Sequence, residues 1–240
     1  MGEVVSLLER PTYDVAEASR LLAVHVRTLE YWLEGGKQGG KVRLPVLRES
    51  ATGSRELTWG EFVEARYVRA YRRDHNVPLH ALRGFIIEMR QALGVRYPLA
   101  HLQPWVGEGR RLLLAAQLTS ELPEELWSVV EPTTGRWLLT APAESFLEVV
   151  EFDGAQYALR LRPDGSLSPV VIDPEVRFGA SSVGGISTAA LKELFDAGDP
   201  VELVAKDYDL PLNDVVAALD FERRLAEAAK RGENPEPRVA

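Results

Sequence analysis

Residues 13–33 read YDVAEASRLLAVHVRTLEYWL, and this stretch decides how the first part of the chain folds. Asp14 and Glu17 have the spacing of a helix capping box, which predicts a first helix that ends near residue 22. After a short turn, apolar residues at helical spacing predict a second helix with its core face at Val26, Leu29 and Leu33. Two short helices joined by a tight turn predict a helix-turn-helix.

The other face of the second helix carries Arg27, Thr28 and Tyr31, where a recognition helix meets the major groove. An arginine can read guanine with two N–H groups, and hydroxyl groups suit phosphates. Beyond Gly35, residues 39–48 alternate enough to predict a strand, and residues 50–54 predict the loop that completes a wing. The basic residues expected to contact phosphate there are Lys37, Lys41, Arg43, Arg48 and Arg55.

Two longer helices are predicted after the wing. Thr58 and Glu61 form another capping box, which predicts a helix through about residue 73. Pro78 predicts the start of the next helix, over about residues 79–93. Its apolar residues follow a 3-4 spacing that favours a core face, with a dimer contact as the alternative.

Residues 95–169 have a different texture, in which prolines separate short apolar runs. We predict strands at 112–116, 137–140 and 156–162, and short helices at 124–130 and 144–150. No motif stands out, so this segment is expected to be a small α+β hairpin unit.

The last part of the chain predicts a second helix-turn-helix-like unit. A short strand at 170–176 and a loop at 178–185 precede three helices, which begin near residues 187, 199 and 212. The expected fold class is therefore α+β and mostly helical, with a DNA-binding domain at 1–94, the middle unit at 95–169, a helical domain at 170–230 and a tail at 231–240. Arg231 and Arg238 in the tail are candidate partner contacts, and a frayed terminus is the alternative.

Composition narrows the function classes. The chain has 240 residues and no cysteine, which excludes disulfides and thiolate zinc sites. No apolar stretch approaches the roughly 20 residues that span a bilayer, and the first ten residues lack the apolar run of a signal peptide. We expect a cytoplasmic protein without membrane contact.

The net charge of -8 is unevenly distributed. Residues 20–90 carry 13 Lys and Arg against 8 Asp and Glu, whereas residues 112–240 carry 11 against 23. A DNA reader attached to an acidic module would have this distribution, and chance clustering on solvated faces is the alternative.

No catalytic constellation is found. The four histidines have no ligand spacing, and the glycines near residues 107 and 179 lack the remainder of a nucleotide-binding or nucleophile motif. We therefore expect no enzyme activity, no metal and no cofactor.

The N-terminal stretch resembles the MerR-type winged helix. The matching pieces are residues 13–18, Arg27-Thr-Leu29, Tyr31-Trp32 and Leu57-Thr-Trp59. The match departs at Glu30, where the family has a basic residue, and at His25, where a Ser or Thr cap is usual. Because a glutamate there repels phosphate, the promoter unwinding of the metal-sensor type is not carried over.

The C-terminal segment resembles an antitoxin-associated domain of unknown function, number 433 in its series. The matching pieces are residues 172–179, 185–188, 197–200, 204–208 and 215–219. With both of these segments, the chain resembles a VapB-type antitoxin. They imply a homodimeric repressor that binds operator DNA and neutralises a co-encoded VapC-type toxin with a PIN ribonuclease domain.

Two alternatives remain open. One is a stand-alone MerR-like transcription regulator whose residues 95–170 bind a small molecule. The other is an interaction scaffold that does not bind DNA, in which both helical segments only pack.

Overall fold

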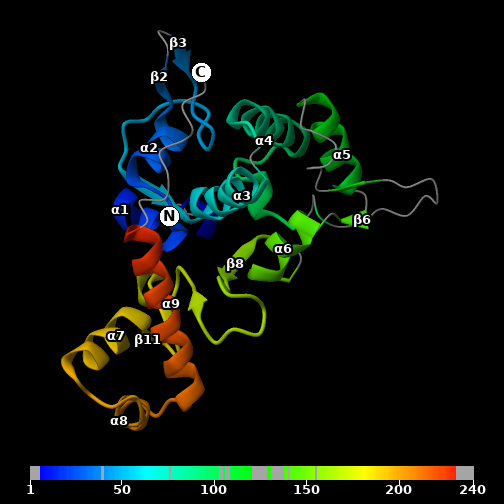
Figure 1. Ribbon diagram of the computed structural model, residues 1–240. Helices are drawn as coiled ribbons and strands as arrows, with labels where there is room; N and C mark the ends of the chain where they lie inside the picture. Colours follow the sequence, from blue (N-terminus) through cyan, green and yellow to red (C-terminus); the bar gives the residue numbers. More distant parts are fainter. Residues whose placement is uncertain are drawn as a thin grey trace, which may run out of the picture.

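The computed structural model describes residues 6–38, 41–75, 77–102, 105, 109–120, 129–130, 138–139, 141–154 and 156–230. Helices dominate, and short antiparallel strands join them, so the expected α+β class is confirmed (Figure 1). No described helix is long and apolar enough to cross a membrane.

The N-terminal part begins with a 3-10 turn, η1 (Leu7–Glu9), and continues as a small two-stranded frame. Strand β1 (Pro11–Asp14) pairs antiparallel with β4 (Glu56–Thr58). Between them lie α1 (Val15–Leu22), α2 (Val26–Glu34) and a hairpin of β2 (Gly36–Gln38) and β3 (Lys41–Arg43). Both predicted helices are confirmed. The strand predicted over 39–48 is shorter, because residues 44–55 form an irregular connection to β4.

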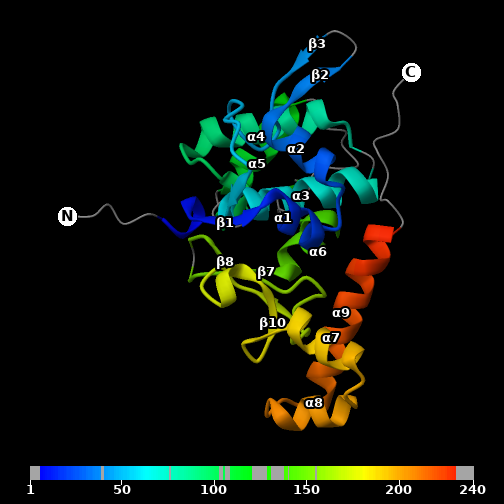
Figure 2. The same ribbon diagram turned by 90° about the vertical axis from the view of Figure 1, so that its left-hand side faces the viewer.

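Helix α3 (Trp59–His75) is the central element of the molecule (Figures 1 and 2). Its capping box is confirmed in both directions, since the Glu61 amide donates to Thr58 Oγ1 at 3.2 Å and the Thr58 amide donates to Glu61 Oε2 at 3.0 Å. The aromatic side chains of Trp59, Phe62 and Tyr67 are buried, and so is the carboxyl group of Glu64. A helix that buries charged residues as well as apolar ones is enclosed on nearly all sides.

Helix α4 (Leu79–Leu93) has the predicted bounds, and α5 (Gly109–Thr119) packs beside it. A short 3-10 turn, η2 (Pro98–Ala100), lies between them in the chain. The strand predicted at 112–116 was wrong, because this run belongs to α5. A short apolar run does not distinguish a strand from a buried helix, and its Leu and Ala residues are good helix formers.

The middle of the chain supplies a hairpin and the start of the main sheet. Strands β5 (Val129–Val130) and β6 (Leu138–Leu139) pair, so the helix predicted at 124–130 was wrong at its last two residues, and residues 124–128 lie outside the described part. Helix α6 (Ala141–Val149) confirms the second predicted helix.

A five-stranded antiparallel sheet follows in chain order. It consists of β7 (Val150–Phe152), β8 (Ala158–Leu161), β9 (Val171–Ile172), β10 (Ser181–Val183) and β11 (Ile186–Ser187). The 3-10 turn η5 (Arg177–Gly179) precedes β10, so the loop predicted at 178–185 was wrong for the residues of β10. The sheet continues without a break past residue 170, where the sequence suggests a domain boundary.

Three helices complete the chain: α7 (Thr188–Ala197), α8 (Val201–Asp207) and α9 (Leu212–Lys230). They form a lobe at the opposite end of the molecule from the β2–β3 hairpin (Figures 1 and 2). One cluster of buried apolar side chains runs from Leu8 to Leu225, so the lobe and the N-terminal part share a continuous core.

Candidate nucleic-acid interface

Two side-chain caps and one residue in the left-handed region define the ends of α1 and the start of α2. The Glu17 amide donates to Asp14 Oδ1 at 2.8 Å and caps α1. Ala23 ends α1 in the left-handed region at φ 50° and reverses the chain. His25 caps α2, because its Nδ1 accepts from the Arg27 amide at 3.1 Å. A histidine therefore fulfils the role that the sequence comparison assigned to a Ser or Thr.

The exposed face of α2 carries the predicted DNA-contact residues. Leu29 and Leu33 are fully buried, whereas Arg27 is exposed and Thr28 and Tyr31 are half-buried. Arg27 therefore lies on the solvent-facing side of α2, and Thr28 and Tyr31 lie at the edges of this exposed face.

Glu30 on the same helix pairs with Arg55 at 3.0 Å. The Arg55 side chain is largely exposed, and it arrives from the connection that precedes β4. This ion pair offsets the charge that makes Glu30 unfavourable beside a phosphate backbone, and it places Arg55 against the exposed face of α2.

The β2–β3 hairpin starts directly at the end of α2 and projects from the molecule (Figures 1 and 2). Lys37 lies opposite Val42, and Gly36 lies opposite Arg43. Lys37 and Arg43 are exposed, and the Val42 side chain is 72% exposed. The backbone of Lys41 belongs to β3, but its side chain lies outside the described part.

Gly35 allows the hairpin to begin directly after α2. Its φ of 68° is in the left-handed region, and an added Cβ would lie 2.2 Å from the carbonyl oxygen of Arg43. No side chain fits between the two strands at this point, so the residue must be glycine.

Arg83 of α4 holds the base of the hairpin, which the sequence analysis did not anticipate. Its guanidinium donates to the carbonyl oxygens of Leu44 and Pro45, the latter at 2.8 Å, and it also interacts with the Tyr31 side chain. Burial lowers the pKa of Arg83 below its ordinary value, and nearby Tyr31 partly offsets this effect. An arginine 39 residues beyond the hairpin carries no sequence signal for this contact.

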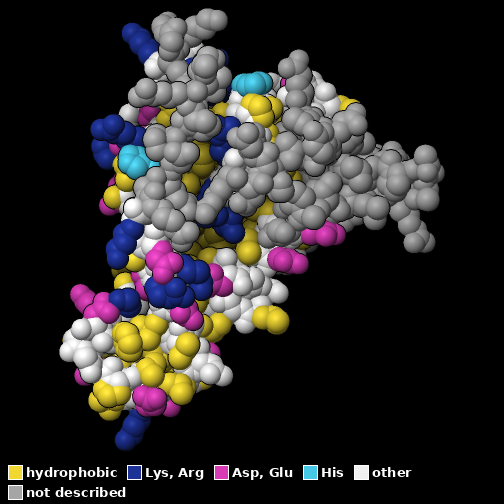
Figure 3. All heavy atoms as spheres, in the orientation of Figure 1, with side chains coloured by type: hydrophobic (Ala, Val, Ile, Leu, Met, Phe, Trp, Pro, Cys, Tyr) yellow, Lys and Arg dark blue, Asp and Glu magenta, His cyan; other side chains and the backbone are white. Residues whose placement is uncertain are grey.

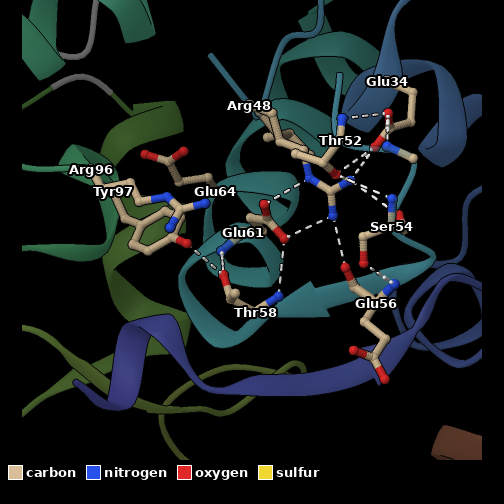
Figure 4. A network of polar contacts seen from close by, with 12 residues as sticks. Glu34, Arg48, Thr52, Ser54, Glu56, Thr58, Glu61, Glu64, Arg96 and Tyr97 are labelled. Carbon is tan, nitrogen blue, oxygen red and sulfur yellow. Dashed lines mark hydrogen bonds and ion pairs between the residues drawn. The ribbon is translucent and has the colours of Figure 1, made fainter. Parts of the chain in front are cut away.

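Arg48 was wrongly predicted as a phosphate contact. Its side chain is only 5% exposed and donates to Glu61 at 2.9 and 3.3 Å and to Glu34 (Figure 4). It also donates to Thr52 Oγ1 at 2.8 Å and to the carbonyl oxygens of Ser54 and Glu56 at 3.1 and 2.7 Å. Arg48 therefore ties α2, α3 and the 44–55 connection together instead of facing DNA.

The carboxylate of Glu34 completes this network. It accepts from the amides of Thr52 and Gly53, both at 2.8 Å. Burial raises the pKa of Glu34, but the Gly53 amide and Arg48 together lower it below its ordinary value. A carboxylate that stays charged keeps the 44–55 connection fixed against the end of α2.

A second buried pair lies behind this network. Arg90 of α4 donates to Glu64 of α3 at 3.0 Å and to the carbonyl oxygen of Leu47 at 2.5 Å. Burial raises the pKa of Glu64 to about 7, although Arg90 and the Leu99 amide counteract this shift. Beside this pair is a hollow of about 520 Å³, whose lining includes the three arginines Arg48, Arg90 and Arg96.

The N-terminal part is also joined to the C-terminal lobe. Arg20 of α1 donates to Glu222 of α9 at 3.0 Å, and Glu222 accepts from Thr188 Oγ1 at 2.5 Å. The Tyr13 hydroxyl donates to the carbonyl oxygen of Gly179 at 2.8 Å. Polar contacts therefore hold β1 and α1 against the sheet and α9.

Arg231 and Arg238 lie outside the described residues. Within the described part of the chain, no group of three or more His, Asp or Glu side chains could hold a metal ion.

Comparison with known proteins places the chain in a family. No family model matches it. The uncharacterised protein Rv2308 of Mycobacterium tuberculosis is 31% identical over 230 residues, which cover 92% of this chain and 94% of that protein. The chain belongs to the family of Rv2308.

Two further matches, one by sequence and one by structure, come from the same organism. VapB45, whose name marks it provisionally as an antitoxin, is 25% identical over 225 residues, with 88% of this chain and 93% of VapB45 covered. The crystal structure of Rv2018 matches with a TM-score of 0.69 at 25% identity and covers 90% of this chain and all of that one. The name of VapB45 gives weak support to the antitoxin part of the expected resemblance. The MerR-type part stays a prediction.

Proposed function

We propose that this protein is a DNA-binding antitoxin that represses its own operon. The observation that carries the DNA half is the geometry of α2: Arg27 is exposed in its first turn, the exposed Arg55 pairs with Glu30 one turn further along, and the hairpin projects beyond the end of the helix (Figure 1). In the proposal this arrangement acts as a winged helix-turn-helix, in which a recognition helix enters the major groove and the wing follows the backbone.

Each side chain of this surface has a distinct expected role. Arg27 reads a base edge, and Thr28 and Tyr31 contact phosphate or sugar at the margin of the groove. Lys37, Lys41, Arg43 and Arg55 supply phosphate contacts, which give affinity and salt dependence but no choice of sequence. Two copies of the chain would place their recognition helices in adjacent half-sites of an operator.

The antitoxin half rests on similarity to VapB45. The proposed partner is a co-encoded VapC-type ribonuclease with a PIN domain. Such a nuclease needs acidic residues around its metal, so a protein that covers this cluster stops RNA cleavage. Arg231 and Arg238 of the tail are candidates to reach those carboxylates.

The DNA half is tested by fluorescence anisotropy on the DNA upstream of the protein's own gene, at physiological salt and with scrambled competitor. Arg27→Ala is expected to weaken specific binding about 10- to 100-fold, as for the loss of one base contact. Arg43→Ala should weaken binding to all sequences and reduce the salt slope by about 1. Arg223→Ala on the far lobe is the matched control. Equal binding by wild type and Arg27→Ala would reject this interface.

The antitoxin half is tested separately with the product of the neighbouring gene. We expect the two proteins to co-purify and the ribonuclease activity of the partner to disappear in the complex. Active nuclease in the presence of excess protein would contradict this half and leave the DNA result untouched.

A second candidate is a stand-alone regulator that senses a small molecule. The hollow beside Arg90 and Arg96 favours it, because the buried Nη1 of Arg90 has no hydrogen-bond partner among the described residues and, with Arg96, could bind a carboxylate or phosphate group, although Glu49 and Glu61 also line the space. Thermal stabilisation by inorganic phosphate or succinate, lost in Arg96→Ala, would favour this candidate over the antitoxin.

A further inference from the structure

Large apolar side chains are exposed in one region of the lobe. Of the 12 that are exposed among the described residues, five lie between residues 195 and 216, each 39–45% exposed. We call these five side chains the apolar patch: Phe195, Leu203, Tyr208, Leu212 and Val216. Exposed apolar residues are ordinary when they are scattered, so this concentration is the informative feature.

The patch spans three helices that pack against one another. Phe195 lies in the last turn of α7, Leu203 lies in α8, and Tyr208 directly follows α8. Leu212 and Val216 are one turn apart and therefore share a face of α9. Figure 3 shows apolar side chains gathered over the lobe that these helices form, with acidic and basic side chains around them.

The charge around the patch selects the kind of occupant. Residues 188–216 carry seven Asp and Glu against two Lys. Lys192, one of these two, is paired with Asp196, so the segment keeps an excess of negative charge. Another acidic surface, including the same face of a second copy, would be repelled, and so would a nucleic acid.

The fold holds the patch firmly in place. Val215 and Ala218, next to Val216 on α9, are fully buried, and the same helix reaches back to Arg20 of α1 through Glu222. A rigid apolar surface with a charged margin needs little ordering on binding, which favours affinity.

We infer that the apolar patch on α7, α8 and α9 is the docking surface for a protein whose contact face is apolar and surrounded by Lys and Arg. This inference rests on the partner half of the proposed function, and it names the surface on which the co-encoded nuclease binds.

The test measures the affinity of the tagged neighbouring-gene product for the full-length protein by isothermal titration calorimetry. The double variant Leu212→Ser with Val216→Ser is expected to bind at least 10-fold more weakly, as for the loss of central apolar contacts. Leu167→Ser is the matched control, because Leu167 is 99% exposed and lies outside the patch. Circular dichroism melting verifies that both variants are folded.

A charge variant tests the kind of partner. Glu202→Gln with Asp207→Asn should slow association and reduce its dependence on salt, since charges at an interface margin act mainly on the association rate. Glu144→Gln on α6 is the control. An unchanged association rate in the first variant would contradict a basic partner.

The outcomes separate this inference from the proposed function. Wild-type binding that the double variant retains would overturn the patch and leave the antitoxin proposal in place. Failure of the wild type to bind would overturn both. A wild-type dimer that the double variant converts to a monomer in sedimentation equilibrium would identify a second copy as the occupant and overturn the inference.

Discussion

Replacing Arg48 by leucine is expected to lower the free energy of unfolding by about 3 kcal/mol. Leucine fills part of the space of the arginine stem but leaves the carboxyl groups of Glu61 and Glu34 without their shared cation. The Glu61 side chain is only 3% exposed, so water cannot replace the lost partner there. Removal of one partner from a buried ion pair costs about 3–5 kcal/mol in comparable proteins.

The lower end of that range applies for a structural reason. Glu61 still accepts from the Thr58 amide at 3.0 Å, and Glu34 still accepts from the Thr52 and Gly53 amides. For a chain of this length, about 3 kcal/mol corresponds to a fall in Tm of roughly 6–12 °C. The carbonyl oxygens of Ser54 and Glu56 also lose their donor, so the 44–55 connection should exchange its amide protons faster.

Urea unfolding followed by circular dichroism measures the change. The double variant Arg48→Leu with Glu61→Leu should recover part of the loss, because no carboxylate is then left unpaired at the centre of the network. An Arg48→Leu variant that keeps its stability but binds DNA with a reduced salt slope would refute the reasoning. It would show that Arg48 contacts phosphate in solution, as the sequence analysis predicted.

Three further predictions follow from single positions. Gly35→Ala should lower the free energy of unfolding, measured in urea, by about 2 kcal/mol or more, because the new Cβ would collide with the backbone of the hairpin. The same variant should also weaken DNA binding. Gly53→Ala is the control: its φ of 71° is similar but the space around it is open, so it should cost only about 1 kcal/mol. Because the pKa of Glu64 is raised, the folded state keeps a proton that the unfolded state loses as the pH rises. The free energy of unfolding should therefore fall by about 1.4 kcal/mol per pH unit between the pKa of the unfolded state and about pH 7. Glu64→Gln should abolish this slope. Glu222→Gln should lower the free energy of unfolding by about 1–2 kcal/mol, because Arg20 and Thr188 lose a charged acceptor. Hydrogen exchange in α1 should become faster. Arg223→Gln on the exposed face of α9 should change neither quantity.

Each of these has a result that would contradict it. Equal stability of the two glycine variants would mean that the hairpin does not return so close to α2. A flat difference between wild type and Glu64→Gln across pH 5–7 would mean that the pKa of Glu64 is not raised and that its carboxylate stays ionised beside Arg90. Unchanged exchange in α1 of the Glu222 variant would mean that the lobe does not hold the helix-turn-helix segment.

The sequence by itself determined the helices whose ends are locally encoded. Asp14 and Glu17 marked the start of α1, Thr58 and Glu61 marked the start of α3, and Pro78 preceded α4. These features are visible in sequence because a cap satisfies backbone groups within three or four residues. The exposed position of Arg27 and the buried positions of Leu29 and Leu33 follow in the same way from helical spacing.

Short segments without such signals were assigned wrongly. The run at 112–116 became part of α5, and the loop at 178–185 contains β10, because neither assignment depends on local residues alone. A strand as short as β10 is stable only through its neighbours, and one of these, β9, is separated from it by a turn of positive-φ residues. In a segment this short, packing against neighbouring elements outweighs the intrinsic secondary-structure propensity of the residues.

Only the tertiary structure decided which charged residues face solvent. In sequence, Arg48 and Arg55 are equivalent basic residues of one loop, yet Arg48 is buried against Glu61 and Glu34 while Arg55 stays exposed beside Glu30. The same holds for Arg83, which supports the hairpin, and for Arg20, which reaches Glu222 across 202 residues. A buried cation is tolerated only where carboxylates or carbonyl oxygens converge on it, and that convergence is a property of how α1, α2, α3, α4 and α9 pack in space.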